Sequence, residues 1–337
     1  MRFGPVPVAE AEGAILAHSL QVPGGRLRKG RVLSAEDVAT LTGAGVVQVT
    51  VARLGPGDVA ENTAAARLAR ALVPDPGKVG LRVEEPFTGR VNIRADRPGV
   101  VALDVAAIEA LNLVDPMITL ATVAPWQRAW PGMMVGTVKI IAYGVAEDAL
   151  RDAQAAARAA LSVRPVALGT AGLIVTEVPG APVSRDDKGI RAVAGRLEAL
   201  GITLADLRIV AHDRAAIAAA LTDLRGALKL ILTASATSDI EDVAPAAVGD
   251  AGGAIIRFGM PVDPGNLLFL GQIGADPVIG LPGCARSPAL NGADWVLARI
   301  ACGVPVTGAD IAAMGVGGLL KEIPTRPQPR EAPNRTP

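Results

Sequence analysis

The fold of the C-terminal half of this chain is set by the stretch Leu230-Ile-Leu-Thr-Ala-Ser-Ala-Thr-Ser-Asp-Ile-Glu-Asp-Val-Ala-Pro-Ala-Ala247. An apolar strand leads into a loop of small, hydroxyl-bearing and acidic residues, and a helix start follows. A second stretch, Val278-Ile-Gly-Leu-Pro-Gly-Cys-Ala-Arg-Ser-Pro288, makes the same change from strand to turn. Loops that follow neighbouring parallel strands meet at one edge of the sheet, where they can hold one polar ligand. We therefore expect a binding site in this half of the chain.

Strand and helix patterns alternate on both sides of residues 230–247. Strands are expected at 166–176, 207–211, 230–233 and 254–258, helices at 187–200, 213–224 and 287–301, and a hairpin within 267–280. Strands that alternate with helices of about a dozen residues are typical of a parallel sheet with helices on both faces. The sequence predicts an α/β domain of this kind over residues 163–303.

Residues 1–160 have a different pattern, with short segments broken by Gly and Pro. Ser34 and Asp37 form a capping-box signature at the start of a short helix, and Gly43 and Gly45 end it. A strand is expected at 46–52, a helix at 58–72, several short strands between 79 and 145, and a helix at 147–161. The prediction is a smaller α+β or β-rich N-terminal domain.

The chain from 304 to 337 is rich in Gly and Pro. A segment of this composition buries too little apolar surface to offset its chain entropy. We expect it to be a disordered tail or a linker, so that deletion from Glu322 onward leaves folding and ligand binding intact.

Composition narrows the function classes. Lys and Arg total 33 of the 337 residues, and Asp and Glu also total 33, so no net charge attracts nucleic acid or anionic lipid. The two cysteines and two histidines exclude a disulfide framework and a zinc cluster. Without a signal peptide or a long apolar span, the chain is expected to be soluble and cytoplasmic.

The loop that begins at the end of the strand expected at 230–233 contains several hydroxyl and carboxylate side chains. Its hydroxyls belong to Thr233, Ser235, Thr237 and Ser238, and its carboxylates to Asp239, Glu241 and Asp242. Hydroxyls and helix N–H groups can bind a phosphate, while carboxylates can bind Mg²⁺ or a heterocycle that donates hydrogen bonds. The alternative is a plain capped turn in which Asp239 or Asp242 is the N-cap.

The second loop combines a rigid turn at Pro282 and Gly283 with Ser287 and Pro288, which resemble an N-cap and a first helical residue. An anion would fit at such a helix start. Cys284 lies beside this turn with no histidine near it in the sequence, so a buried structural thiol is the favoured interpretation over a nucleophile.

Two further loops precede helices at the same expected edge. His212 and Asp213 follow the strand at 207–211, where Asp213 caps a helix and His212 is interpreted as a polar loop residue rather than a base. Asp186 and Asp187 precede the next helix, and a solvated capping loop and a ligand contact are equally open there.

Taken together, residues 163–303 resemble the molybdopterin-binding domain that molybdopterin adenylyltransferases and molybdopterin molybdotransferases share. The adenylyltransferase pattern of Thr-Gly-Gly-Thr-Gly, a spacer and Asp-Val-Thr-Pro-Glu-Ala is matched without a gap by Thr233 to Thr237 and Asp242-Val-Ala-Pro-Ala-Ala247. The molybdotransferase pattern of Pro-Gly-Lys-Pro, a hairpin and Gly-Leu-Pro-Gly-Asn-Pro is similar to Pro264-Gly-Asn-Leu, the hairpin and Gly280-Leu-Pro-Gly-Cys-Ala285. Residues 33–51 resemble the molybdotransferase N-terminal region.

The resemblance implies a molybdopterin ligand, a place in molybdenum cofactor biosynthesis or maturation, and Asp242 as the catalytic or otherwise functional carboxylate. We expect ligand contacts from Thr233, Ser235, Thr237, Ser238, Asp239, Glu241, Asp187, Asp213, Pro282, Gly283 and Ser287. Mg²⁺ and a nucleotide are further implied ligands, with no metal-binding residue assigned. The variant at 280–288 is similar to binding domains fused ahead of a cofactor nucleotidyltransferase, which is an implied partner, and a homo-oligomer is expected.

The departures from these patterns bear on catalysis. The paired glycines of the phosphate loop are Ala234 and Ser235 here, the lysine is Asn266, and Asn-Pro is Cys284-Ala285. Added Cβ atoms and a lost cation weaken nucleotide transfer more than ligand recognition. The sequence thus favours a molybdopterin-binding protein, with an active adenylyltransferase or molybdotransferase and a structural oligomerising scaffold as the alternatives.

Overall fold

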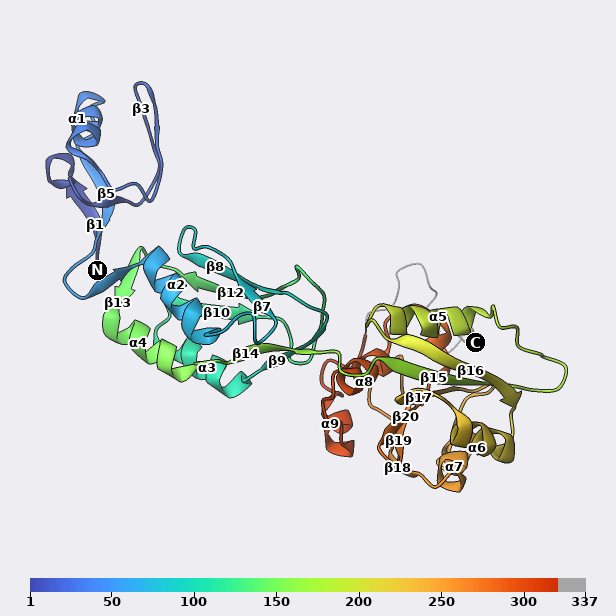
Figure 1. Ribbon diagram of the computed structural model, residues 1–337. Helices are drawn as coiled ribbons and strands as arrows, with labels where there is room; N and C mark the ends of the chain where they lie inside the picture. The colour runs from blue at the N-terminus through green and yellow to red at the C-terminus, as the bar shows by residue number, and fades with distance from the viewer. Residues whose placement is uncertain (321–337) are drawn as a thin grey trace, which may run out of the picture. The chain divides into compact units, whose positions relative to one another are not determined.

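The computed structural model describes residues 1–320 of the chain. It divides into two compact units, Met1–Arg164 and Pro165–Pro337, the second described up to residue 320. Each unit has hydrophobic clusters of its own. Both units mix helices and strands, so the expected α/β fold with a preceding α+β domain is what the structure has (Figure 1).

The first 60 residues of the N-terminal unit form small antiparallel pairings around a short helix. Their elements are β1 (Arg2–Pro7), η1 (Val8–Glu10), β2 (Ile15–Leu16), β3 (Leu20–Val22), β4 (Gly25–Leu27), α1 (Ala35–Gly43), β5 (Gln48–Arg53) and β6 (Asp58–Ala60). β5 lies between β1 and β2, and β3 pairs with β4. The capping box of Ser34 and Asp37 is confirmed at the start of α1.

The rest of this unit packs three helices against short antiparallel strands. Its elements are α2 (Glu61–Leu72), β7 (Leu81–Val83), β8 (Arg90–Ala95), β9 (Gly99–Leu103), α3 (Val105–Val114), β10 (Ile118–Thr122), β11 (Arg128–Ala129), β12 (Met134–Ile140), β13 (Gly144–Ala146), α4 (Glu147–Ala156) and β14 (Leu161–Pro165). The largest sheet here has the order β10-β12-β8-β7. The expected helix at 147–161 ends at Ala156, and Leu161 begins a strand instead.

The C-terminal unit is built on one six-stranded sheet in the order β16-β15-β17-β20-β19-β18. Its elements are β15 (Thr170–Glu177), α5 (Lys188–Glu198), β16 (Thr203–Ala211), α6 (Arg214–Asp223), β17 (Leu228–Leu232), α7 (Val243–Asp250), β18 (Ala254–Phe258), β19 (Phe269–Ile273), β20 (Asp276–Leu281), η2 (Gly283–Arg286), α8 (Gly292–Ala301) and α9 (Gly308–Ala313). β16, β15, β17 and β20 are parallel, β19 runs antiparallel to β20, and the edge strand β18 runs antiparallel to β19.

Helices cover both faces of this sheet (Figure 1). Alternate residues of each buried strand point to opposite faces. Leu173 and Val175 of β15 pack in the cluster of α5, α8 and α9, whereas Ile174 packs in the cluster of α6 and α7. Burial on both faces explains why Leu230, Ile231 and Leu232 of β17 are consecutive apolar residues.

Gly280 of β20 faces the ring of Phe269 across the β19–β20 pair. A Cβ atom at position 280 would lie 2.0 Å from the nearest ring carbon, and Phe269 is fully buried. The first glycine of the Gly-Leu-Pro-Gly segment is therefore required by packing inside the sheet.

Residues 304–320 correct the expectation of a tail that begins at 304. Thr307 caps α9 with a capping box that includes Asp310, and Ile311 and Met314 are buried in the core of the C-terminal unit. A few well-spaced apolar side chains dock this segment despite its many glycines. The remainder of the expected tail or linker, residues 321–337, lies outside the described residues.

Candidate functional site

The sheet order fixes where a ligand would bind. From β15 the chain crosses through α5 to β16 on one side, whereas from β17 it passes through α7 toward β18, β19 and β20 on the other. Ligands of open α/β sheets bind outside the carboxyl ends of strands at such a switch in direction. Here that point lies between β15 and β17, and the loops after β15, β16, β17 and β20 leave the sheet at the same edge.

The loop after β17 is held together by its own hydroxyls. Thr233 Oγ1 donates to the carbonyl of Ser235 at 2.7 Å and lies 3.4 Å from the Thr237 hydroxyl. Thr233 and Thr237 are buried, whereas Ser235 and Ser238 are exposed. In this arrangement the buried threonines shape the loop, and the exposed serines are the hydroxyls within reach of a ligand.

Asp242 begins α7 as its N-cap. Its Oδ1 accepts from the N–H of Val243 at 2.7 Å, and its Oδ2 accepts from the N–H of Ser238 at 3.2 Å. A carboxylate offers about four lone-pair positions, so each oxygen can accept a further hydrogen bond. The structure thus gives Asp242 the capping role and leaves acceptor capacity for a ligand.

Of the other two carboxylates of the loop, Asp239 has a local role. Asp239 Oδ1 accepts from the N–H of Glu241 at 2.8 Å, which closes a turn, and both side chains are exposed. Among residues 1–320 no group of three or more His, Cys, Asp or Glu side chains gathers as a metal ion would require.

Three strand ends are tied together beside this loop. His212, just after β16, is 2.9 Å from the Thr176 hydroxyl through Nδ1 and 2.8 Å from the Ser235 hydroxyl through Nε2. Thr176 Oγ1, near the end of β15, also accepts from the N–H of Ala234 at 2.7 Å. Neither Ala234 nor Ser235 takes a positive φ. The two residues that replace glycines are thus accommodated without backbone strain, and the Ala234 amide already has a partner.

Arg286 connects three loops of the same edge. Its Nη2 donates to the carbonyl of Thr233 at 2.9 Å, and its Nη1 lies 3.4 Å from Asp187 Oδ1. Asp187 in turn caps α5 by accepting from the N–H of Gly189 at 2.7 Å. One guanidinium therefore joins the loops that follow β15, β17 and β20.

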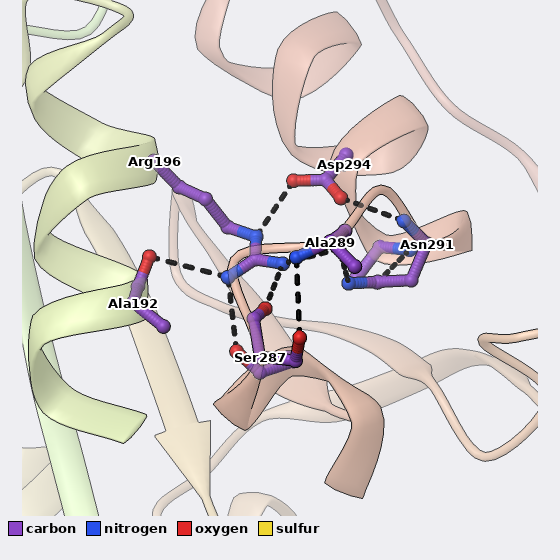
Figure 2. Close-up of polar contacts among 8 residues, drawn as sticks. Ala192, Arg196, Ser287, Ala289, Asn291 and Asp294 are labelled. Atoms are coloured by element: carbon purple, nitrogen blue, oxygen red, sulfur yellow. Dashed lines mark hydrogen bonds and ion pairs between the residues drawn. The ribbon is translucent and has the colours of Figure 1, made fainter. Parts of the chain in front are cut away.

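Arg196 of α5 holds the segment 285–294 in place (Figure 2). Only 8% of its side chain is exposed, and its Nε donates to Asp294 Oδ1 at 2.7 Å. The carbonyls of Ala285, Ser287 and Ala289 accept further hydrogen bonds from it across this loop, at 2.9, 2.7 and 3.0 Å, and the carbonyl of Ala192 accepts one within α5. A planar donor with five N–H groups is suited to such a role, because no water is needed to satisfy the buried carbonyls.

The expected helix start at Ser287 is wrong. Ser287 follows η2, and α8 begins after Asn291, whose side chain forms a capping box with Asp294. Ser287 and Pro288 instead lie in an extended turn that Arg196 satisfies. The anion site expected from a helix N-terminus at Ser287 therefore has no helix behind it.

A cavity of about 550 Å³ opens beside this turn. It is lined by Lys188, Pro264, Gly283, Cys284, Arg286, Ser287, Pro288, Ala289, Leu290 and Asn291. Its size is within the range of small-molecule sites, roughly 300–1,000 Å³. Lys188 and Arg286 give it two cationic side chains, so it is suited to an anionic group.

Cys284 is partly buried rather than fully buried, and it lines the same cavity. Burial raises the pKa of its thiol above the ordinary value, outweighing the nearby Arg196, which lowers it. The thiol form is therefore favoured at neutral pH, and the structure offers no support for a nucleophile at this position.

The structure gathers most of the residues singled out in the sequence at one edge. Thr233, Ser235 and Asp187 are linked through His212 and Arg286, and Gly283 and Ser287 line the cavity with Pro282 just before it. Asp213 is an exposed N-cap of α6 whose side chain accepts from the N–H of Ala216, and its role is local to that helix.

Sequence reasoning missed Thr176, Arg196 and Arg286. Arg286 lies within the segment 278–288, and its positive charge beside the turn is a signal from which a ligand contact could have been predicted. The partners of Arg196 lie about 90 residues away in the sequence, and no local pattern shows such a pairing.

Comparisons with known proteins add little to this geometry. A family model described as a domain of unknown function (DUF8806) matches residues 5–53. No curated protein matches the chain. Among the described residues no helix is long and apolar enough to span a membrane.

Solved structures similar to this chain include two proteins of cofactor biosynthesis. A molybdopterin biosynthesis MoeA protein from Pyrococcus horikoshii is 13% identical with a TM-score of 0.33, covering 89% of this chain and 75% of its own. A structure titled molybdenum cofactor biosynthesis protein B is 18% identical with a TM-score of 0.26, covering 39% of this chain and 86% of its own. TM-scores this low do not support an inference about function, so the functional proposal rests on the residues of this chain.

Proposed function

We propose that the C-terminal unit binds molybdopterin at the carboxyl edge of its sheet and that the protein serves molybdenum cofactor biosynthesis or maturation. The observation that carries the proposal is the link between Arg286 and the carbonyl of Thr233. It joins the two segments on which the resemblance rests, 233–247 and 280–288, at one edge beside a cavity with two cations.

The chemistry of the ligand matches the groups at this edge. A pterin ring carries a pair of N–H donors that the free lone pairs of Asp242 can accept. The phosphate of the ligand is suited to Lys188 and Arg286, since a guanidinium and an ammonium both bind phosphate oxygens strongly. Asp242 and Arg286 would then hold opposite ends of the molecule.

Purification of the full chain with its ligand tests the proposal. Released pterin is detected by its fluorescence and its mass, and the purified protein is titrated with molybdopterin. We expect saturable binding by the wild-type protein and weaker binding by Arg286→Gln. Absence of pterin together with absence of binding would favour the structural scaffold and end the proposal.

An active transferase is the second candidate, and one contact weighs against it. The N–H of Ala234, which would face a phosphate in the glycine-containing loop, is already donated to Thr176. We expect no adenylyl transfer from ATP by the wild-type chain with molybdopterin and Mg²⁺ present. A turnover number of about 1 per second or more, inside the usual enzyme range, would restore the transferase candidate.

The proposal extends to the cellular setting of the protein. It takes the protein to act in the cytoplasm as a homo-oligomer and to pass its ligand to a cofactor nucleotidyltransferase. Gel filtration with light scattering, and transfer of bound ligand to such an enzyme, measure these two points.

A further inference from the structure

A chain of side-chain hydrogen bonds links Thr176, His212 and Ser235 at the ends of β15, β16 and β17. The Thr176 hydroxyl is 2.9 Å from His212 Nδ1, and His212 Nε2 is 2.8 Å from Ser235 Oγ. Thr176 has no exposed surface, His212 is half-buried and Ser235 is exposed. The chain therefore leads from the core to the ligand side of the site.

The direction of these bonds follows from the donors that are fixed. The backbone N–H of Ala234 can only donate, so Thr176 Oγ1 is its acceptor at 2.7 Å. Thr176 is fully buried, so its own hydroxyl hydrogen also needs an acceptor. Within the described part of the chain, His212 Nδ1 is the acceptor at hydrogen-bond distance. Nδ1 thus carries no proton in the neutral ring, and Nε2 carries it.

This assignment makes Ser235 an acceptor from His212. The Nε2–H group donates to Ser235 Oγ, and the hydroxyl hydrogen of Ser235 is left to point away from the ring. An activated serine nucleophile needs the reverse arrangement, in which Nε2 accepts the serine proton and a third group holds Nδ1–H. The distance between Ser235 Oγ and His212 Nε2 is that of a nucleophile and its base, but the hydrogen bond donated by the buried Thr176 hydroxyl makes His212 the donor and Ser235 the acceptor.

We propose that His212 is a positioning residue that makes the Ser235 hydroxyl an outward hydrogen-bond donor, and that Ser235 selects for a ligand oxyanion such as an ionised phosphate. The identity of that oxyanion as the phosphate of molybdopterin rests on the proposed function. An oxyanion has acceptors only, so a donor fixed by the protein recognises it at no cost in hydroxyl reorientation.

Nitrogen NMR of the full-length protein tests the bond direction directly. Histidine labelled with ¹⁵N distinguishes the two neutral tautomers, and a His18→Gln variant assigns the two histidines of the chain. At a pH where the ring is neutral we expect the Nε2–H tautomer for His212. A dominant Nδ1–H tautomer in the wild-type protein would overturn the proposal, whatever the ligand is.

A variant and a chemical probe sharpen this measurement. In Thr176→Val the donor to Nδ1 is lost, and we expect a mixture of tautomers at His212. A fluorophosphonate probe reports activated serines, and we expect no labelling of wild-type protein at Ser235. Labelling that Ser235→Ala abolishes would show that His212 activates the serine, and the proposal would be wrong.

Titration with molybdopterin tests the ligand class. We expect Ser235→Ala to weaken binding about tenfold, as loss of a bond to a charged acceptor does. Thr222→Ala removes a hydroxyl on α6 that bonds only its own helix, at 3.1 Å, and is expected to bind as the wild type does. Equal affinity of Ser235→Ala and wild type would overturn the oxyanion assignment.

Failure of the proposed function gives a different result. A wild-type protein that binds no molybdopterin would end the proposed function and the oxyanion assignment together. The tautomer of His212 would still be judged by NMR alone, because that measurement uses the protein without ligand.

Discussion

Asp242 has a structural duty and a proposed ligand duty, and substitution separates the two. Asp242→Ala removes the acceptor for the N–H groups of Val243 and Ser238. Loss of an N-cap costs about 0.5–2 kcal/mol of stability. We expect molybdopterin affinity to fall far more than that cost explains, as measured by pterin fluorescence titration alongside urea unfolding.

A matched control is the N-cap of α3 in the other unit. Asp104 accepts from the N–H of Ala107 at 3.0 Å, so Asp104→Ala is expected to cost similar stability and leave ligand affinity unchanged. If Asp242→Ala binds as tightly as the Asp104 variant, Asp242 is only a cap.

Arg196 is a residue whose substitution we expect to lower the free energy of unfolding, because it holds the segment 285–294 in place. Arg196→Met leaves the carbonyls of Ala285, Ser287 and Ala289 without their donor and breaks the ion pair with Asp294. Removing one partner of a buried pair costs about 3–5 kcal/mol. We expect a loss of that order in urea unfolding.

The exposed pair of Arg191, on the same helix, and Asp186, in the loop before it, provides the comparison. Arg191 is 61% exposed, so Arg191→Met is expected to change stability by less than about 1 kcal/mol. Similar losses in the two variants would contradict the bridging role of Arg196.

Local signals at the ends of elements could be predicted from the sequence, and long-range ones could not. Ser34 and Asp37 stand three residues apart, so their capping box is visible in the sequence and is confirmed. Asn291 and Asp294 have the same spacing, but Ser287-Pro288 resembles a helix start and drew the prediction four residues too early. Ser287 and Asn291 are both suitable N-cap residues by local sequence. The hydrogen bonds from Arg196 to the carbonyls of Ser287 and Ala289 hold the first position outside the helix, so that the helix begins after Asn291.

The candidate site shows the same division. Loop positions such as Thr233 and Asp242 follow from the strand-to-helix pattern, because the end of an apolar run marks a sheet edge. The side chains that bond residues 233–235 of this loop, Thr176, His212 and Arg286, come from other strands and loops. Their contacts depend on sheet order, which the sequence pattern leaves open.

The short helix α9 makes the stability of its segment depend on pH. The Thr307 side chain and backbone N–H donate to Asp310, which lowers the pKa of that carboxyl below its ordinary value. A lowered folded-state pKa contributes stability that is present above the unfolded value, near 3.9, and lost as pH falls through the folded value. We expect Asp310→Asn to unfold more easily at pH 7 and to lose less stability than wild type below about pH 4. An unchanged pH dependence in urea unfolding would show that Asp310 contributes nothing to it.

Docking of the segment 304–320 leads to a truncation test. Ending the chain at Gly303 removes Val306, Ile311 and Met314 from the core, so we expect the melting temperature to fall by several degrees or more. Ending it at Leu320 keeps all the described contacts and is expected to leave the melting temperature unchanged. Equal melting temperatures for the two truncations would contradict the docking of α9.

At the scale of the whole molecule, the two units have separate cores. The clusters around α2 and β5 draw only on residues up to 164, and those around β15 and β17 only on residues after it. We expect a fragment that begins at Pro165 to unfold cooperatively and to bind molybdopterin as the full chain does, as measured by calorimetry and fluorescence titration. An unfolded fragment would show that the sheet needs the first unit.

The close approach of Gly280 to Phe269 has an evolutionary consequence. The Gly-Leu-Pro-Gly segment resembles a ligand-binding motif, yet its first glycine is required because an aromatic ring on the neighbouring strand leaves no room for a side chain. Descendants of this chain could acquire a side chain at 280 only after the ring at 269 had shrunk, so the two positions are bound to drift as a pair. The glycine would therefore persist whether or not this segment binds a ligand.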